Sequence, residues 1–158
     1  MEAQKSIKIT DEKVALQKAE RYCAYQERSQ QEVRDKLYEW GLWTDAVENI
    51  IVNLIGNNFL NEERFANTYT RGKFNQKNWG RVKIKQGLKQ KRVPDVLIKK
   101  ALKTIDGDEY VKTLTKVLVK KAALLTEKDP FKRRYKLQQY AMSRGFEGDL
   151  VGDVLGEM

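Results

Sequence analysis

The chain has 158 residues, of which 41% are apolar, and its 31 Lys and Arg against 22 Asp and Glu give a net charge of +9. A chain this basic attracts polyanions, while the lack of histidine and the single cysteine exclude imidazole catalysis, an internal disulfide and a cysteine-built zinc site. No apolar run reaches membrane-spanning length and no signal-peptide core is present. We therefore expect a cytoplasmic protein that requires no cofactor or metal and contacts no membrane.

Residues 1–10 are predicted to form a flexible arm, and residues 11–59 a first module of three helices. Apolar residues at helical spacing mark each helix, and residues 29–32 match a capping box. The residues expected to cap the three helices are Thr10 or Asp11, Ser29 and Thr44.

The second module is predicted at residues 60–106. Its first helix starts at Asn61, and a loop through Asn78 and Gly80 leads into the next helix. Pro94 opens the third helix, because proline is tolerated in a first helical turn.

The third module is predicted at residues 107–158. It opens at Asp108, and Asp129 with Pro130 starts its second helix, which ends at Gly145. A short helix with apolar residues at 151, 154 and 155 completes the module.

One pattern of apolar and turn residues recurs three times, at spacings of 51 and 53 positions. The three copies are Val33, Leu37, Gly41, Leu42, Val47 and Ile51; Ile84, Leu88, Arg92, Val93, Ile98 and Leu102; and Leu137, Ala141, Gly145, Phe146, Val151 and Leu155. Such a repeat indicates one small supersecondary unit used three times, which must stack on its neighbours to bury its apolar face. The fold prediction is an all-α protein, with three tandem three-helix, helix-turn-helix-like repeats in an elongated, curved array.

Positive charge is concentrated in the second module. Residues 61–106 carry thirteen cations and four acids, while residues 1–60 carry more acids than cations. Twelve of the cations fall between positions 71 and 103, where Asp95 is the only acid. Like charges at helical neighbour spacing, such as Arg81, Lys85 and Lys89, are mildly destabilising, so the pattern favours a polyanion-facing surface over a merely solvated face.

Four aromatic residues lie near predicted turns, where they could pack inside the protein or contact a partner. Trp40 and Trp43 flank Gly41 and are expected to seal the junction between modules. Trp79 precedes the basic helix, and Phe74 lies in the same region. Both either pack on the core or lie exposed, where a ring could contact a base or a protein partner.

An ordered set of residues runs through all three copies. In the second copy it comprises the run from Asn61 to Ala66, then Tyr69, Arg71, Trp79, Gly80, Lys83, Ile84, Leu88 and Lys91. The first copy contributes Ala19, Tyr22, Ser29 and the run from Glu32 to Leu37, and the third contributes Arg134, Leu137, Ala141, Arg144, Gly145 and Phe146. With this set the chain resembles the RecX family of regulatory proteins over about residues 11–155.

The resemblance implies an array of three-helix modules that binds in the groove of the filament formed by the RecA recombinase on single-stranded DNA. It also implies inhibition of filament growth, strand exchange and ATP hydrolysis. Four positions depart from the family pattern: Arg92 and Val93 stand where Gly-Ile is common, Gly87 where glutamate is common, and Arg81 where proline is common. These departures touch the basic helix and leave the fold prediction unchanged.

The leading hypothesis is a non-enzymatic, monomeric regulator of a RecA-type recombinase filament, with contacts to single-stranded DNA and weaker ones to duplex DNA. Capping of filament ends and filling of the groove both remain open. The residues expected to contact the partner are Arg71, Lys73, Lys77, Trp79, Arg81, Lys83, Lys85 and Lys89.

Two other function classes compete with this hypothesis. A direct nucleic-acid-binding module would use Lys99, Lys100 and Lys103 on a DNA-facing helix, with contacts mostly to phosphates. An enzyme would need catalytic carboxylates, and the nearest pair, Glu62 and Glu63, is better explained as helix-start charge.

Overall fold

The computed structural model describes residues 11–158, and the expected arm at residues 1–10 lies outside them. Over the described residues the chain forms nine α-helices and no strand, which confirms the all-α prediction. In chain order the helices are α1 (Glu12–Tyr25), α2 (Gln30–Glu39), α3 (Thr44–Gly56), α4 (Glu62–Lys77), α5 (Arg81–Gln90), α6 (Asp95–Lys103), α7 (Gly107–Leu124), α8 (Pro130–Ser143) and α9 (Gly148–Glu157).

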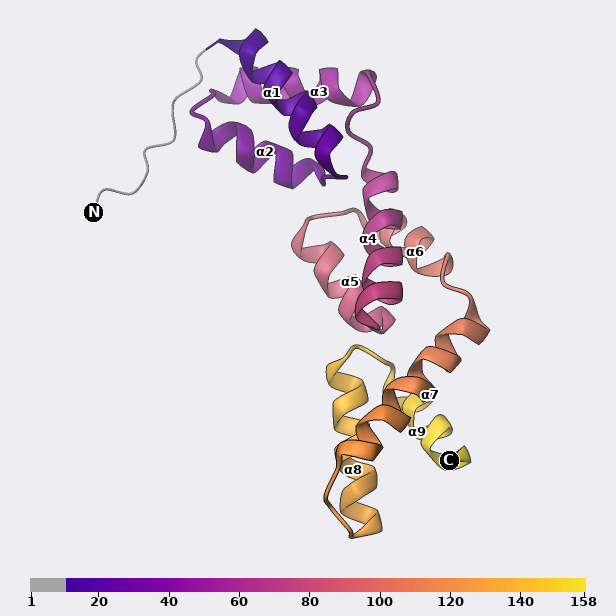
Figure 1. Cartoon of the computed structure of the whole chain (residues 1–158). Helices are drawn as coiled ribbons and strands as arrows, with labels where there is room; N and C mark the ends of the chain where they lie inside the picture. The colour runs from indigo at the N-terminus through magenta and orange to yellow at the C-terminus, as the bar shows by residue number, and fades with distance from the viewer. Residues whose placement is uncertain (1–10) are drawn as a thin grey trace, which may run out of the picture.

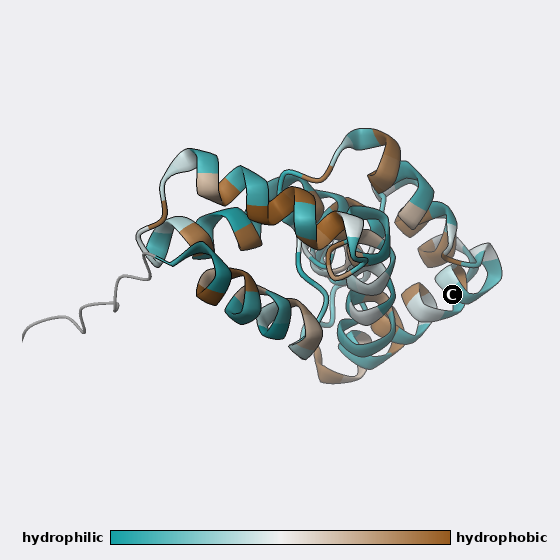
Figure 2. Cartoon of the chain, turned by 90° about the horizontal axis from the view of Figure 1, so that it is seen from above, coloured by the Kyte–Doolittle hydropathy of each residue, from teal (hydrophilic) through white to brown (hydrophobic). Residues whose placement is uncertain are grey.

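The helices form three units that follow one another along a bent rod (Figure 1). Packing is concentrated inside the units: α3 packs on α1 and α2, α4 on α5 and α6, and α8 on α7 and α9. Apolar segments recur along the helices between hydrophilic ones (Figure 2), as expected for small amphipathic bundles. The predicted elongated, curved array of three repeats is therefore confirmed.

The turn between the last two helices has the same conformation in every unit. Gly41, Arg92 and Gly145 adopt φ of 95°, 58° and 99°. In each turn the next amide bonds the carbonyl five residues back, as in Leu42 to Leu37, Val93 to Leu88 and Phe146 to Ala141. Glycine adopts this left-handed conformation without strain, whereas an L-residue such as Arg92 costs roughly 1 kcal/mol there. The register of the sequence repeat is thus reproduced in the backbone.

Most helix starts follow the predicted capping residues. The side chains of Asp11, Ser29, Asn61 and Asp129 accept backbone N–H groups of the first turns, and Ser29 and Glu32 form the expected capping box. One predicted cap was wrong: α3 starts without a side-chain cap, because its N-cap residue is Trp43 and Thr44 is already helical. The first helix of the third unit, α7, begins at Gly107, one residue before the predicted opening at Asp108, and the Asp106 side chain caps it.

The apolar core divides unequally among the units. One cluster, built around Leu37, Ile50 and Leu54, lies within the first unit. A second cluster runs without interruption from Phe65 to Leu155, through the second and third units. The second and third units therefore share a core, while the first unit is a separate bundle.

The junction of the second and third units is made by backbone contact. The Gly80 amide donates to the Arg144 carbonyl (2.9 Å), and the Val82 amide donates to the Gly145 carbonyl (2.9 Å). A methyl group at Gly80 would overlap the backbone of Gly145 and Phe146. Only glycine permits this approach, so the turn before α5 and the turn after α8 are fixed against each other.

Three aromatic rings continue that junction into the core. Tyr110 of α7 stacks on Phe74 of α4, with ring centroids 5.9 Å apart, and packs against Phe146 at 5.3 Å. Phe74 is therefore a core residue, which settles its two possible roles in favour of packing.

Charged groups join the first unit to the second. Arg64 of α4 pairs with Glu27 (2.6 Å) and also bonds Asn58. The Glu62 carboxylate accepts the amide of Gln30 at the start of α2 (3.1 Å). Burial raises the pKa of Glu62, although its bond from Gln30 opposes the shift. Glu62 thus stabilises a helix N-terminus across the junction, which adds to the helix-start role expected for it.

The two tryptophans of the first unit do not seal a junction. Trp43 is 85% exposed at the turn before α3, and Trp40 packs partly against the core of its own unit. The expectation failed because the first unit is joined to the second through the segment that connects α3 to α4 and the start of α4, away from the Trp40–Trp43 turn.

The buried Cys23 gives a test of the first unit's packing. Its side chain lies in the core, and burial raises the pKa of the thiol to about 11. Because the thiolate is the reactive form, we expect a thiol reagent at pH 8 to label native protein roughly 100-fold more slowly than unfolded protein, whose cysteine pKa is near 8.5. Equal labelling rates in buffer and in denaturant would show that Cys23 is accessible to solvent in the native protein.

Candidate partner-binding surface

The end of α4 and the start of α5 place the predicted contact residues. α4 ends at Lys77, and the next residue, Asn78, adopts the left-handed conformation. The Asn78 amide bonds the Lys73 and Phe74 carbonyls. This tight turn brings Trp79 between the two helices, and Gly80 then caps α5. Residues from two helices therefore meet around one aromatic ring.

Trp79 is half-buried and packs against the shared core. The ammonium groups of Lys73 and Lys83 lie 4.9 and 4.6 Å from the centre of its ring. Exposed cation–π contacts contribute about 0.5–1 kcal/mol each. Trp79 therefore orients a lysine from α4 and a lysine from α5 on the same site, and its ring remains partly accessible.

Three more of the predicted contact residues are exposed lysines. Lys77, Lys85 and Lys89 are exposed, and over the described part of the chain no ion pair joins any of them to an acid. Lys85 and Lys89 lie one turn apart on α5, where like charges repel mildly. We call the predicted contact residues on and next to α5 the α5 surface: Lys73, Lys77, Trp79, Lys83, Lys85 and Lys89.

Two predicted contact residues lie elsewhere. Arg81 forms an ion pair with Glu147 (3.0 Å), and its guanidinium lies 3.8 Å from the centre of the Tyr110 ring. Its amide also donates to the Tyr110 hydroxyl (2.9 Å), which in turn bonds Glu147. Burial, together with the bond to Glu147, raises the pKa of Tyr110. Arg81 thus links the second unit to the third through Glu147 and Tyr110. Its contact with a partner stays a prediction.

Arg71 is separated from the α5 surface. It lines a hollow of about 560 Å³ with Phe74, Asn75 and Asn78 on one side and the start of α7 on the other. The structure therefore brings Lys73, Trp79 and Lys83 together and places Arg71 and Arg81 at the boundary with the third unit.

Gly87 lies inside α5, where a glycine lowers helix stability relative to alanine. Packing against α4 explains why a glycine is needed there. A methyl group there would overlap the hydroxyl of Tyr69 on α4. The glycine therefore lets α5 approach α4 closely.

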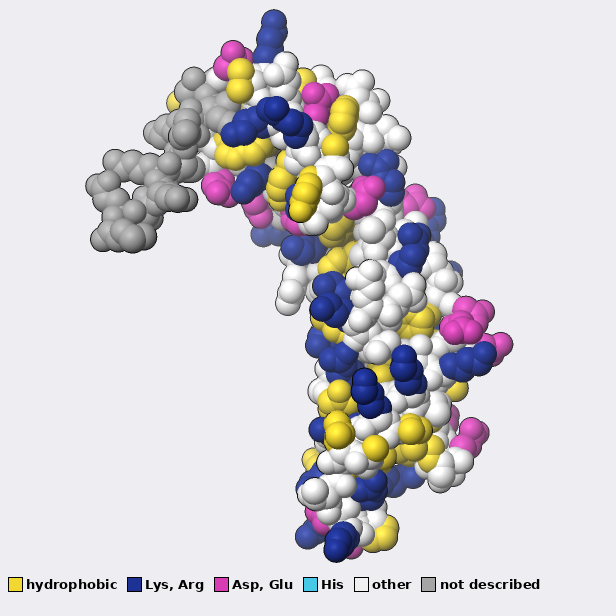
Figure 3. Space-filling view, viewed as in Figure 1, with side chains coloured by type: hydrophobic (Ala, Val, Ile, Leu, Met, Phe, Trp, Pro, Cys, Tyr) yellow, Lys and Arg dark blue, Asp and Glu magenta, His cyan; other side chains and the backbone are white. Residues whose placement is uncertain are grey.

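Charge is distributed unevenly over the molecular surface. Lys and Arg side chains run along the edge where α5 lies, while Asp and Glu side chains gather on the first unit and at the start of α7 (Figure 3). On α6, Lys99 and Lys103 are exposed, and the Lys100 ammonium lies 3.9 Å from Glu63. The cations of α7 and α8 were not identified from the sequence as a binding surface. Acids elsewhere in the third unit offset their charge, so the net charge of the unit gave no signal.

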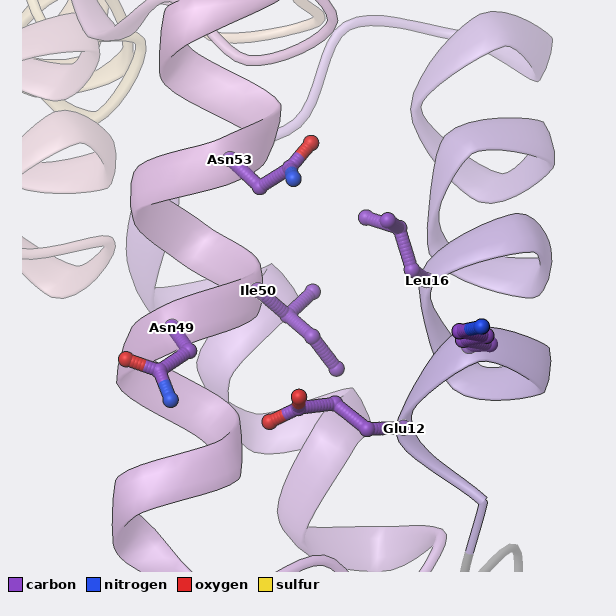
Figure 4. A pocket seen from close by; sticks show the side chains of 6 residues that line it. Glu12, Leu16, Asn49, Ile50 and Asn53 are labelled. Atoms are coloured by element: carbon purple, nitrogen blue, oxygen red, sulfur yellow. The ribbon is translucent and has the colours of Figure 1, made fainter.

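The hollow between α1 and α3 differs from these surfaces. Glu12 and Leu16 face Asn49, Ile50 and Asn53 across it (Figure 4). Its volume is about 120 Å³, and its lining includes one carboxylate, one ammonium and two amides. With opposite charges balanced in so small a space, it offers no concentrated binding chemistry.

Two features are absent from residues 11–158. No helix there is long and apolar enough to cross a membrane. No group of three or more His, Cys, Asp or Glu side chains within this range could hold a metal ion.

Comparison with known proteins gives one consistent match. Family models described as the first, second and third three-helix domains of RecX match residues 15–54, 61–102 and 108–155. A protein of Prosthecochloris aestuarii named Regulatory protein RecX is 30% identical over 94% of this chain and 96% of its own length. A Clostridium perfringens protein of the same name is 31% identical over 81% of this chain, which spans 60% of that relative.

Solved structures agree with the sequence matches. The crystal structure of RecX from Lactobacillus salivarius superimposes with a TM-score of 0.85 at 25% identity, covering 92% of this chain and 95% of that one. The three units and their order are therefore the same in both chains.

Proposed function

Because the chain belongs to the RecX family, we propose that it is a regulatory protein that binds the RecA recombinase filament on single-stranded DNA and inhibits its recombinase and ATPase activities. The proposal includes no catalytic role for the chain itself. It assigns the partner contact to the α5 surface.

The observation that carries the proposal is the set of exposed lysines without acidic partners on α5. Lys85 and Lys89 repel each other without a compensating ion pair in residues 11–158, and Lys73 and Lys83 are held around Trp79. An anionic partner would remove that repulsion and use the oriented side chains.

The shape of the molecule supports a filament as the partner. A recombinase filament on DNA is a long polyanion with repeating protomers. An elongated array of three units can contact more than one protomer, so that several weak contacts add to a high avidity.

A direct nucleic-acid-binding module is the second candidate. Lys99 and Lys103 are exposed one turn apart on α6, as a DNA-facing helix requires. Lys100 lies near Glu63, which reduces the net charge of that helix face. The face of α6 that carries Lys99 and Lys103 is therefore the weaker candidate for binding an anionic partner.

The proposed function is tested by DNA-dependent ATP hydrolysis. Adding the protein to cognate RecA on single-stranded DNA is expected to lower the hydrolysis rate in a dose-dependent manner. Inhibition at ratios far below one molecule per protomer would indicate capping of filament ends, while inhibition near saturation would indicate groove binding. An unchanged hydrolysis rate at saturating protein would refute the proposal.

A further inference from the structure

A second cationic surface lies in the third unit, in a cleft bounded by α7, the end of α8 and the turn after α4. The cleft has a volume of about 240 Å³. The residues that line it are Asn78, Lys116, Val117, Lys120, Lys121, Leu124, Tyr140 and Arg144. None of them belongs to the α5 surface.

Four of the lining residues are cations and none is an acid. Lys116 and Lys120 are exposed one turn apart on α7, and the Lys121 ammonium lies 4.7 Å from the centre of the Tyr140 ring. The Arg144 guanidinium donates to the Lys77 carbonyl, which holds it at the cleft edge, and its buried Nε has no hydrogen-bond partner. Positive charge is thus concentrated in a concave site, where an anion gains most.

The adjacent hollow differs from the cleft in its charge. It shares Asn78 and Lys116 with the cleft and continues along α7 toward Asp106 and Glu109. These acids make that end unfavourable for phosphate. The favourable part is the cleft itself, where Lys116, Lys120, Lys121 and Arg144 meet no acid.

The apolar part of the lining indicates which polyanion fits. Leu124 is 73% exposed at the cleft, and the Tyr140 ring is half-buried beside it. Proteins that bind single strands combine a cationic groove with apolar or aromatic surface for unstacked bases. A duplex keeps its bases stacked inside and would leave this apolar surface unused.

We propose that this cleft binds a single nucleic-acid strand directly, with phosphates on Lys116, Lys120 and Arg144 and a base against Leu124 and Tyr140. The turn at residues 77–80 borders both surfaces, since Asn78 lines the cleft and Trp79 lies between Lys73 and Lys83. This proposal rests on the proposed function and adds to it a separate site for the DNA strand. Its test omits the recombinase, so that a failure of the cleft proposal can be told from a failure of the proposed function.

The test compares two lysine pairs of equal spacing. Lys116→Gln with Lys120→Gln removes two charges from the cleft, and Lys128→Gln with Lys132→Gln removes two exposed charges outside it. Binding of a labelled oligothymidylate is measured by fluorescence anisotropy at several salt concentrations. We expect the cleft variant to bind about 10-fold more weakly and to flatten the log–log salt slope by about 1.4, the value for two single-strand phosphates. The control pair should leave both quantities unchanged.

A third variant tests the base contact. Leu124→Ser should weaken binding of oligothymidylate but not of an abasic sugar-phosphate strand of the same length. Equal weakening by both lysine pairs would mean that only overall charge matters and would overturn the proposal. Tighter binding of a duplex than of a single strand would overturn it as well.

Discussion

Reversing Lys85 and Lys89 to glutamate is expected to abolish inhibition of the recombinase while leaving the protein folded. Both side chains are exposed and lack an acidic partner in the described chain, so their replacement breaks no internal contact. Each reversal turns an attraction to an anionic partner into a repulsion. If each costs about 1.4 kcal/mol, the pair weakens filament binding about 100-fold. The readout is strand exchange by cognate RecA at a fixed concentration of the variant.

The matched control is Lys99→Glu with Lys103→Glu. These lysines are also exposed, also one turn apart and also in the second unit, so the change in net charge is the same. We expect this variant to inhibit like the unmodified protein. Full inhibition by the folded α5 variant, or an equal loss in the α6 variant, would remove the α5 surface from the account. Loss in the α6 variant alone would favour the direct nucleic-acid-binding candidate.

Replacing Gly80 by alanine is expected to lower the free energy of unfolding by about 3 kcal/mol, near the upper end of overpacking costs. The added methyl group would overlap the backbone of the turn after α8, which cannot rotate away as a side chain could. The shift needed to relieve it would also strain the hydrogen bonds from Gly80 to Arg144 and from Val82 to Gly145. The effect is measured by urea unfolding followed by circular dichroism.

Gly72→Ala is the control for this substitution. A methyl group at Gly72 would meet no atom within 4 Å, and the residue lies within α4. Alanine is favoured over glycine in a helix by about 1 kcal/mol, so this variant should be more stable than the parent protein. If the two variants changed stability in the same direction and by the same amount, the close contact between the second and third units would not contribute to folding.

The sequence repeat predicted the architecture because its positions follow local rules. Apolar residues at helical spacing define the buried face of each helix, and the turn at Gly41, Arg92 and Gly145 recurs at one offset from them. These relations depend on neighbours within about five residues. Nine helices in three units could therefore be derived without any knowledge of long-range contacts. The module limits at 59/60 and 106/107 stay a prediction.

Contacts between distant segments could not be predicted in the same way. Arg81 looks like one more cation of a basic helix, and its pairing with Glu147 depends on a fold that brings residues 66 positions apart together. The repeat also treats all three copies alike, so it gave no indication that the second and third units share a core while the first does not. That difference arises from the close backbone contact at Gly80 and from the Tyr110 ring, which packs between Phe74 and Phe146.

The candidate surface was predicted in part. Charge density located the α5 surface, since lysines without nearby acids stand out in a sequence. The positions of Lys73 and Lys83 around Trp79 require the turn at Asn78, which aligns two helices. The cations of the cleft were hidden because Lys116 and Lys120 are spaced along one helix, while Arg144 comes from the end of another.

The most direct test is to measure binding of the labelled protein to three targets under one buffer: free RecA, single-stranded DNA alone, and RecA assembled on that DNA with a non-hydrolysable nucleotide. The account predicts the tightest binding to the assembled filament, and a loss of that preference when Lys85 and Lys89 are reversed. Affinity for the filament no higher than for the bare strand would contradict it.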